Sequence, residues 1–188
     1  MISNLMITYV AFLRGINVGG NKTIQMPRLK TCLEALGLKH TRTHLNSGNA
    51  VFASEGADRA KLQASIESAI EREFGFRPAV MLRTAADLGR VIAKNPFPQM
   101  AKDDPSHLLV MFLAGKARKD AAQKLAETHS GPEEIRIVGE TAYVTYPKGI
   151  GTSKLTGAQL EKHLGIVGTG RNWNTVAKLA AIAGAISG

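Results

Sequence analysis

The first half of the chain alternates between segments with strand periodicity and segments with helix periodicity, and this order constrains the fold most strongly. Strand patterns cover residues 6–13, 43–45, 50–54 and 79–82, and helix patterns cover residues 27–36 and 62–74. Gly37 and Gly75 end the two helix patterns, and a tight turn at residues 46–49 joins the two short strands. The order βαββαβ predicts the split βαβ unit of a ferredoxin-like sheet.

The second half repeats much of this order. Strand patterns cover residues 107–113, 134–138 and 141–146, helix patterns cover residues 118–128 and 159–164, and a final helix begins near Trp173. We interpret this half as βαββα followed by a C-terminal helix. The sequence therefore predicts an α+β protein built by duplication, with two similar ferredoxin-like (βαββα) lobes, antiparallel sheets and a C-terminal helix.

A proline-rich stretch separates the two halves. Thr84 and Asp87 have the spacing of a capping box for a helix that stops before Asn95. The segment that follows contains three prolines and is typical of a stiff connection. We expect a first lobe with its helix at residues 1–95, a linker at 96–106, and a second lobe with the C-terminal helix at 107–188.

The charge of the chain favours anionic partners. Its 188 residues include 24 Lys and Arg against 15 Asp and Glu, a formal net charge of +9. Such a basic protein attracts phosphorylated metabolites or nucleic acid, and the alternative is a charged surface that serves solubility alone. A single cysteine favours the reducing cytoplasm. The N-terminal apolar run stops at Arg14, too early to span a bilayer, so we expect no membrane partner.

The stretch RGINVGGNKT, residues 14–23, nearly matches a phosphate-binding P-loop. Gly15 and Gly20 have the required separation, but Asn21 intervenes before the Lys-Thr pair and moves both groups out of register. The glycine spacing also fails the dinucleotide pattern, and we predict no cofactor. The loop still carries candidate ligand-binding groups, namely Arg14, Gly15, Asn17, Gly19, Gly20 and Lys22. The alternative is a plain connection between strand and helix.

Topology predicts that a second polar segment lies beside this loop. In a ferredoxin-like lobe the end of the first strand and the hairpin between the second and third strands share one edge of the sheet. This places Asn46, Ser47 and Asn49 as further candidate ligand-binding residues. The alternative is an ordinary hairpin turn, where Asn and Gly are favoured for backbone reasons.

A third polar cluster opens the final helix. Asn172 is a candidate N-cap, and Arg171 beside the first N–H groups predicts a helix terminus that accepts anions, with Asn174 and Thr175 as further candidates. The alternative is capping and core packing alone. Just upstream, the glycine-rich loop YPKGIGTSKLTG offers Lys148, Ser153 and Lys154, of which Lys154 is our candidate ligand-binding residue.

Read together, these segments resemble the bacterial family catalogued as domain of unknown function 1697. The matching residues are Arg14, Gly15, Asn17, Gly19, Gly20, Ser47, Gly48, Asn49, Ser153, Lys154, Leu155, Arg171, Asn172, Trp173 and Thr175. The resemblance covers nearly the whole chain and implies an α+β protein of two related subdomains. It implies no reaction, substrate or catalytic residue.

We therefore expect a protein that binds a small anionic or phosphorylated ligand at a cluster of loops rich in Gly, Asn and Arg. The alternatives are a nucleic-acid-binding protein that uses its basic surface, and a non-catalytic oligomeric interaction protein. Five histidines lack metal-ligand spacing, so we predict no metal site. No carboxylate stands in the polar motifs to serve as a base, and the sequence leaves open whether a reaction is catalysed.

Overall fold

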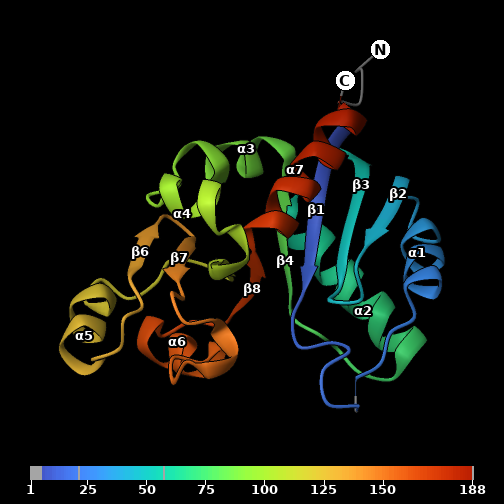
Figure 1. The fold of residues 1–188 in the computed structure, drawn as a ribbon. Helices are drawn as coiled ribbons and strands as arrows, with labels where there is room; N and C mark the ends of the chain where they lie inside the picture. Colours follow the sequence, from blue (N-terminus) through green and yellow to red (C-terminus); the bar gives the residue numbers. More distant parts are fainter. Residues whose placement is uncertain (1–5, 21, 57, 188) are drawn as a thin grey trace. The chain divides into compact units, whose positions relative to one another are not determined.

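The computed structural model describes residues 6–20, 22–56 and 58–187 and contains two four-stranded antiparallel sheets (Figure 1). The chain forms two compact units. Unit 1 comprises the residues up to Gly89 together with those from Lys178 onward, and unit 2 comprises Arg90–Ala177. The α+β class and the two similar lobes with antiparallel sheets are confirmed.

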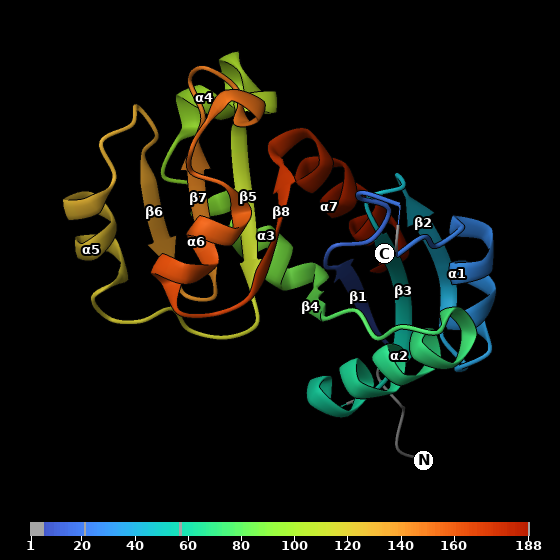
Figure 2. The same ribbon diagram turned by 90° about the horizontal axis from the view of Figure 1, so that it is seen from below.

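Unit 1 is the ferredoxin-like lobe expected for the first half. Its strands are β1 (Met6–Leu13), β2 (Lys39–His44), β3 (Asn49–Glu55) and β4 (Val80–Thr84), in the order β2-β3-β1-β4. The helices α1 (Met26–Glu34) and α2 (Arg59–Phe74) lie on the same side of this sheet (Figure 2). Strand β3 lies between β1 and β2 and runs antiparallel to both.

Alternation along β1 explains why both faces of this sheet are buried. Tyr9, Ala11 and Leu13 belong to the core that packs under α1 and α2. Val10 and Phe12 point to the opposite face and are also fully buried. A strand with apolar residues on both faces is typical of a layer covered on each side.

Unit 2 has the same architecture. Its strands are β5 (Leu108–Leu113), β6 (Ile135–Val138), β7 (Thr141–Thr145) and β8 (Gly168–Asn172), in the order β6-β7-β5-β8. The helices α5 (Ala121–Thr128) and α6 (Gly157–Leu164) bury Leu125, Leu160 and Leu164 in one core with β5 and β7. The two units therefore have equivalent sheets and equivalent helix pairs.

The remaining elements connect or follow these lobes. They are α3 (Ala85–Ala93), α4 (Pro98–Asp103), the short 3-10 helices η1 (Pro105–His107) and η2 (Ile150–Thr152), and α7 (Trp173–Ser187). The expected capping box is present, because the Asp87 N–H donates to Thr84 Oγ1 at 3.0 Å and the Thr84 N–H donates to Asp87 Oδ2 at 2.8 Å. The expected linker contains α4 and the first two residues of η1, and residues from Lys178 onward belong to unit 1. Within the described ranges, no helix is both long and apolar enough to cross a membrane.

Backbone hydrogen bonds recur at equivalent positions of the two units. Residues 10–13 read VAFL in β1, and residues 110–113 read VMFL in β5. The last residue of β1 donates its N–H to the Gly48 carbonyl at 2.8 Å, and the last residue of β5 donates to the Glu140 carbonyl at 3.0 Å. These equivalent hydrogen bonds at the ends of β1 and β5 support the duplication more strongly than the shared order of helices and strands does.

The strands β4 and β8 show the same correspondence. Arg83 and Arg171 each lie opposite a valine of the neighbouring strand, at Val10 and Val110, and each is more than nine-tenths buried. Each guanidinium donates at 2.8 Å to the carbonyl of the residue before it. In both units the next residue caps the helix that follows.

Strand β8 is a strand that the sequence analysis did not predict, since the second half was expected to be βαββα. Its sequence GTGRN contains two glycines and a charged residue, so it has little intrinsic preference for a strand. Pairing with β5 from Leu109↔Asn172 to Leu113↔Gly168 makes it a strand. Both units are thus βαββαβ.

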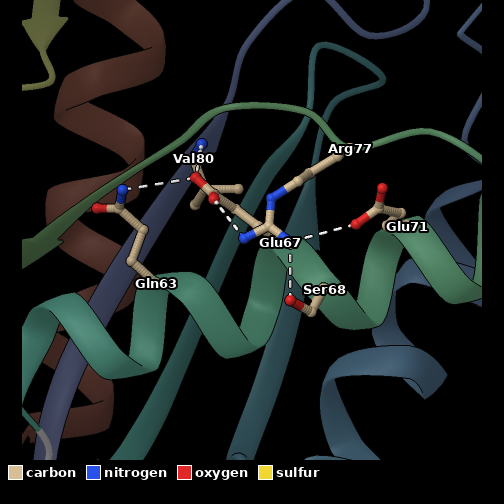
Figure 3. A network of polar contacts seen from close by, with 6 residues as sticks. All are labelled: Gln63, Glu67, Ser68, Glu71, Arg77 and Val80. Carbon is tan, nitrogen blue, oxygen red and sulfur yellow. Dashed lines mark hydrogen bonds and ion pairs between the residues drawn. The ribbon is translucent and has the colours of Figure 1, made fainter.

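A half-buried glutamate links each second helix to the last strand of its unit. In unit 1, Glu67 of α2 accepts the N–H of Val80 at 3.0 Å and pairs with Arg77 at 3.2 Å (Figure 3). In unit 2, Glu161 of α6 accepts the N–H of Gly168 at 2.9 Å. Each glutamate satisfies the backbone donor of the first residue of its strand.

We expect Glu67→Ala to lower the free energy of unfolding by about 1–3 kcal/mol, because it leaves the N–H of buried Val80 without its acceptor. The control is Glu71→Ala. Glu71 pairs with the same Arg77 guanidinium at 3.2 Å but is 52% exposed, and its loss should cost about 1 kcal/mol or less. Urea denaturation of both variants measures the difference, and equal losses would contradict the role given to Glu67.

Candidate functional site

The sequence-predicted residues divide between the two units. In unit 1 they form what we call the loop corner, made of residues 14–25 after β1 and residues 45–48 between β2 and β3. The two segments lie together, as the topology predicts. The Asn17 side-chain amide donates to the Asn46 carbonyl at 2.6 Å and to the Ile24 carbonyl at 3.0 Å. One asparagine therefore joins the hairpin to both ends of the long loop.

Asn17 of the loop corner and Asn49, the first residue of β3, make hydrogen bonds within the protein. Asn17 Oδ1 also accepts the Ile24 N–H at 2.8 Å, and Asn17 adopts a φ of 54°. Asn49 is fully buried, and its amide donates to the His44 carbonyl at 2.8 Å and to Ser47 Oγ at 3.1 Å. Their side-chain amides therefore hold the turns in place. This role agrees with the alternative stated above, in which residues 46–49 form an ordinary hairpin turn.

The other predicted residues of the loop corner surround these amides. Arg14 is half-buried, whereas the residues exposed to solvent are Gly15, Gly19, Gly20, Lys22, Asn46 and Ser47. All three glycines have positive φ, between 65° and 87°. A left-handed backbone at these positions explains why glycine occupies them.

The cluster at the start of α7 differs from the expectation. Arg171 belongs to β8 and is 7% exposed, so it does not stand at an open helix terminus. Its guanidinium donates to Thr169 Oγ1 and to the Gly170 carbonyl at 2.8 Å each, and burial lowers its pKa to about 10. The sequence analysis expected the Arg171 side chain to bind an anion at an open helix terminus. It did not predict that Arg171 is buried, because it did not predict strand β8.

Asn172 is the N-cap that the sequence predicts. Its Oδ1 accepts from the Thr175 N–H at 3.0 Å and from Thr175 Oγ1 at 2.9 Å. Thr175 is buried, while Asn174 is exposed. The polar atoms of Asn172 and Thr175 therefore serve capping.

A cavity of about 540 Å³ lies in unit 2, between the α5–β6 connection and the β7–α6 loop. We call it the lysine cavity. Its lining includes Lys148, Lys154, His129, His163, Glu133 and Ser153. This volume is in the range of small-molecule sites. Lys154 was predicted as a ligand-binding residue, and its neighbours Lys148 and Ser153 were noted on the same loop.

The β7–α6 loop is held in place by its own hydrogen bonds. The Tyr146 hydroxyl donates to the Leu155 carbonyl at 2.9 Å, and Thr152 Oγ1 donates to the Lys148 carbonyl at 2.7 Å. Burial, followed by the negative charge of Glu133, raises the pKa of Tyr146 to about 12. Tyr146 therefore remains a neutral donor at physiological pH, and the lysines project from a braced loop.

Glu133 joins the two sides of the lysine cavity. Its side chain is 6% exposed, Oε2 lies 2.7 Å from His129 Nε2, and Oε1 accepts a hydrogen bond from the Ser153 hydroxyl. Burial acts to raise the pKa of Glu133. Hydrogen bonds from Ser153, from its own backbone and from His129, with the charge of His129, outweigh burial and lower this pKa below its usual value. Glu133 is thus an ionised acceptor at neutral pH.

The order of this contact chain excludes a serine-protease arrangement. A nucleophilic serine is activated by an imidazole that is itself oriented by a carboxylate. Here Ser153 bonds the carboxylate directly and also accepts the Leu155 N–H at 3.0 Å. Among the described residues the Ser153 hydroxyl donates to a carboxylate and not to an imidazole, and the chain Ser153–Glu133–His129 shapes the cavity.

Gly131 makes the close approach of His129 and Glu133 sterically feasible. A Cβ atom at this position would lie 2.6 Å from His129 Nε2 and closer still to Glu133 Oε2. Any larger residue would have to displace the contact between the imidazole and the carboxylate. The contact between His129 and Glu133 therefore favours glycine at position 131.

The two lysines of the cavity are available to an anion. Both are exposed, and within the part of the chain that the structure describes neither ammonium forms an ion pair with a carboxylate. The nearby carboxylate of Glu133 is occupied by Ser153 and His129. No group of three His, Cys, Asp or Glu among the described residues has the arrangement of a metal site.

The two repeats differ in the lengths of two of their connections. The connection between β7 and α6 spans residues 146–156, whereas its counterpart between β3 and α2 spans residues 56–58. The connection after β1 is likewise longer than the one after β5, residues 14–25 against 114–120. Function concentrates in loops that depart from a common scaffold. The lysine cavity and the loop corner are those departures.

Sequence reasoning did not find His129, Glu133 and His163. His129 and Glu133 stand four residues apart in a connection, and Glu133 reaches Ser153, which lies twenty residues further on. The one local signal is the sequence His-Ser-Gly-Pro-Glu, in which Gly131 permits a tight approach.

The stability of the protein should fall in acid partly through Glu133. Because its pKa is lower in the folded protein than in the unfolded chain, ionised Glu133 contributes stability above the ordinary value of 4.5, and this is lost as the pH falls through the folded pKa. We expect Glu133→Gln to show a shallower loss of unfolding free energy between about pH 5 and pH 3 than the natural chain. Urea denaturation across this range measures it, and parallel curves would exclude this contribution.

The comparisons with known proteins agree with this architecture. The family model described as protein of unknown function (DUF1697) matches residues 6–143. The solved structure of conserved bacterial protein SP0830 from Streptococcus pneumoniae aligns with a TM-score of 0.73 and 21% identity, covering 95% of this chain and 99% of that chain. This likeness shows a shared fold. No curated protein has significant sequence similarity to the chain.

Because the family model spans most of the chain, this protein belongs to the DUF1697 family.

Proposed function

We propose that the protein binds a small anionic ligand, with a phosphate-bearing metabolite as the representative case, in the lysine cavity. The observation that carries this proposal is the pair Lys148 and Lys154, which have no carboxylate partner among the described residues, on a loop absent in this length from the other repeat. A cavity of about 540 Å³ accommodates a ligand the size of a sugar phosphate or a nucleoside monophosphate.

The expected affinity follows from the number of charged contacts. A hydrogen bond to a charged group contributes about 1.5–3 kcal/mol, so two lysines provide about 3–6 kcal/mol. A micromolar dissociation constant requires about 8 kcal/mol. Two ammonium groups alone therefore give weak binding, and a tighter ligand must also contact an imidazole or backbone groups of the cavity.

Calorimetry and thermal unfolding with a panel of ligands test the proposal. The panel contains inorganic phosphate, pyrophosphate, sugar phosphates and nucleoside monophosphates, with uncharged sugars and nucleosides as controls. We expect the phosphorylated compounds alone to raise the melting temperature. Binding heats and melting temperatures that stay unchanged at about 10 mM of every compound would contradict anion binding.

The loop corner is a second candidate site for the same class of ligand. It is supported by the hydrogen bonds of Asn17, which hold the loop against the hairpin, and by exposed Lys22 on a loop with positive-φ glycines. The comparison of Lys22→Ala with the lysine-cavity variants distinguishes the two sites. The polar atoms of Asn172 and Thr175 are used in capping, so they support a ligand less directly.

Nucleic acid is the alternative partner that the net charge of +9 favours. Binding through phosphates must weaken as salt concentration rises, because neutralising phosphates releases counterions. A mobility-shift measurement at two salt concentrations decides this point. A complex insensitive to salt would exclude phosphate-driven binding.

The other alternative is an oligomeric interaction protein. It would appear as a dimer or a larger species in light scattering.

A further inference from the structure

Two hydroxyl groups at the lysine cavity donate their protons to the protein itself. Thr128 ends α5 and Thr152 ends η2, and both residues are exposed and line the cavity. Thr128 Oγ1 donates to the Lys124 carbonyl at 2.7 Å. Thr152 Oγ1 donates to the Lys148 carbonyl at 2.7 Å. A hydroxyl has one proton to donate and two lone pairs that accept, so toward a ligand both threonine oxygens are acceptors.

Ser153, a third hydroxyl residue of the lining, has the same limitation. Its hydroxyl donates to Glu133 and its oxygen accepts the Leu155 N–H at 3.0 Å, which leaves one lone pair. The other neutral polar side chains of the lining, Ser130 and Gln159, are exposed and can donate or accept. The lining therefore combines two ammonium donors with several neutral oxygens that accept.

This division of donors and acceptors limits which anion matches the cavity. The oxygens of a phosphate dianion only accept, so they can bond Lys148 and Lys154. They can bond Thr128 or Thr152 only if the threonine gives up its hydrogen bond to the backbone. A ligand hydroxyl donates to the threonine oxygens while their own protons stay in place. An anion without hydroxyl groups leaves these acceptors unused, and such mismatches are a strong source of specificity.

A nucleobase makes fewer matching contacts with this lining than a polyol does. Bases are usually bound by stacking on aromatic or arginine side chains. Among the described residues that line the cavity, the only aromatic rings are the imidazoles of His129 and His163. His129 already contacts the Glu133 carboxylate through Nε2, at 2.7 Å. The hydroxyl groups of a sugar therefore have more partners here than a base has.

We propose that the lysine cavity binds a phosphorylated polyhydroxy compound, such as a sugar phosphate. Its phosphate contacts Lys148 and Lys154, and its hydroxyl groups donate to Thr128 and Thr152. The inference rests on the proposed function and deepens it, because it distinguishes phosphate-bearing ligands by their hydroxyl groups. The ligand binds without forming or breaking a covalent bond. A cavity of about 540 Å³ has room for both parts of such a ligand.

Two probes that differ in their hydroxyl groups test the inference. Glycerol phosphate and propyl phosphate have the same charge and the same number of carbon atoms, but only glycerol phosphate has hydroxyl groups. A hydrogen bond between neutral groups changes affinity by a factor of about two to ten. By isothermal titration calorimetry we therefore expect glycerol phosphate to bind about 4-fold to 100-fold more tightly than propyl phosphate. Adenosine monophosphate should bind no more tightly than ribose-5-phosphate.

Variants without the threonine hydroxyls locate the contacts. Valine has nearly the shape of threonine, so Thr128→Val combined with Thr152→Val removes both acceptors. We expect this variant to lose the preference for glycerol phosphate while its affinity for propyl phosphate stays unchanged. The matched control is Thr31→Val in unit 1, because Thr31 Oγ1 also donates to the carbonyl four residues earlier, that of Pro27. Melting temperatures without ligand show that each variant is folded.

The outcomes separate this inference from the proposed function. Equal affinities for glycerol phosphate and propyl phosphate, with both lost when Lys148 and Lys154 are replaced by alanine, would overturn the polyhydroxy class and leave anion binding standing. A preference for glycerol phosphate that survives in the double threonine variant would overturn the contacts assigned to Thr128 and Thr152. Adenosine monophosphate binding more than about tenfold more tightly than ribose-5-phosphate would replace the sugar phosphate by a nucleotide. Binding of no phosphate compound, or binding unaffected by the loss of both lysines, would overturn the lysine cavity as an anion site, and with it the inference.

Discussion

Replacing Lys148 and Lys154 together by alanine is expected to weaken the binding of inorganic phosphate by at least about 100-fold. Each ammonium that contacts the anion contributes about 1.5–3 kcal/mol, and every 1.4 kcal/mol is a factor of ten in affinity. The loss of both contacts therefore removes between two and four powers of ten. Isothermal titration calorimetry measures the natural chain and the variant under the same salt conditions.

A charge-matched control shows whether the effect is local. Lys116 and Lys119 are exposed and lie outside the cavity lining, so replacing both by alanine removes the same net charge. We expect this control to change affinity by less than about threefold, because separated surface charges are screened by salt. If both double variants weakened binding equally, the lysines would act through net charge and the cavity would lose its support.

Gly48→Ala is expected to lower the free energy of unfolding by about 2–5 kcal/mol. Gly48 has a φ of +84°, a left-handed conformation that costs a residue with a Cβ about 1–2 kcal/mol. The new methyl group would also lie 2.6 Å from Ile16 Cδ1, and overpacking of a buried contact costs about 1–3 kcal/mol more. Ile16 is only 2% exposed, so it has little room to move.

The control for this effect is Gly19→Ala in the same loop corner. Gly19 also has a positive φ, of +69°, but a Cβ there meets no atom within 4 Å. We expect only the backbone cost of about 1–2 kcal/mol. Chemical denaturation separates the two variants, and an equal loss in both would show that the packing of Ile16 against Gly48 contributes nothing.

Local patterns in the sequence predicted most elements of the fold. The structure confirms the strand predicted from alternation in residues 6–13 and the helix predicted from the spacing of Leu62, Ile66 and Ile70. Both patterns are reliable because they reflect which side chains face a core. The helix caps at Thr84 and Asn172 could also be predicted, because each capping hydrogen bond joins residues three positions apart. Strand β8 escaped prediction because its pairing with β5 involves residues about sixty positions earlier.

The candidate site was predicted in part. Topology correctly placed the loop after β1 beside the hairpin, since strand order determines which loops share an edge. The role of each side chain could not be predicted in the same way. Asn17 and Asn49 bond within the protein, and Arg171 is buried, because burial and partners depend on segments that are distant in sequence.

The sequence by itself determined the class of fold, the duplicated order of strands and helices apart from β8, the positions of the caps and the excess of positive charge. These properties are sums or short-range patterns of side-chain chemistry, so they need no knowledge of contacts between distant residues. Only the tertiary structure decided that Glu133 bridges His129 and Ser153 beside two lysines. A cavity is a property of how two loops approach each other, and hydrogen bonds and close packing across the fold govern that approach.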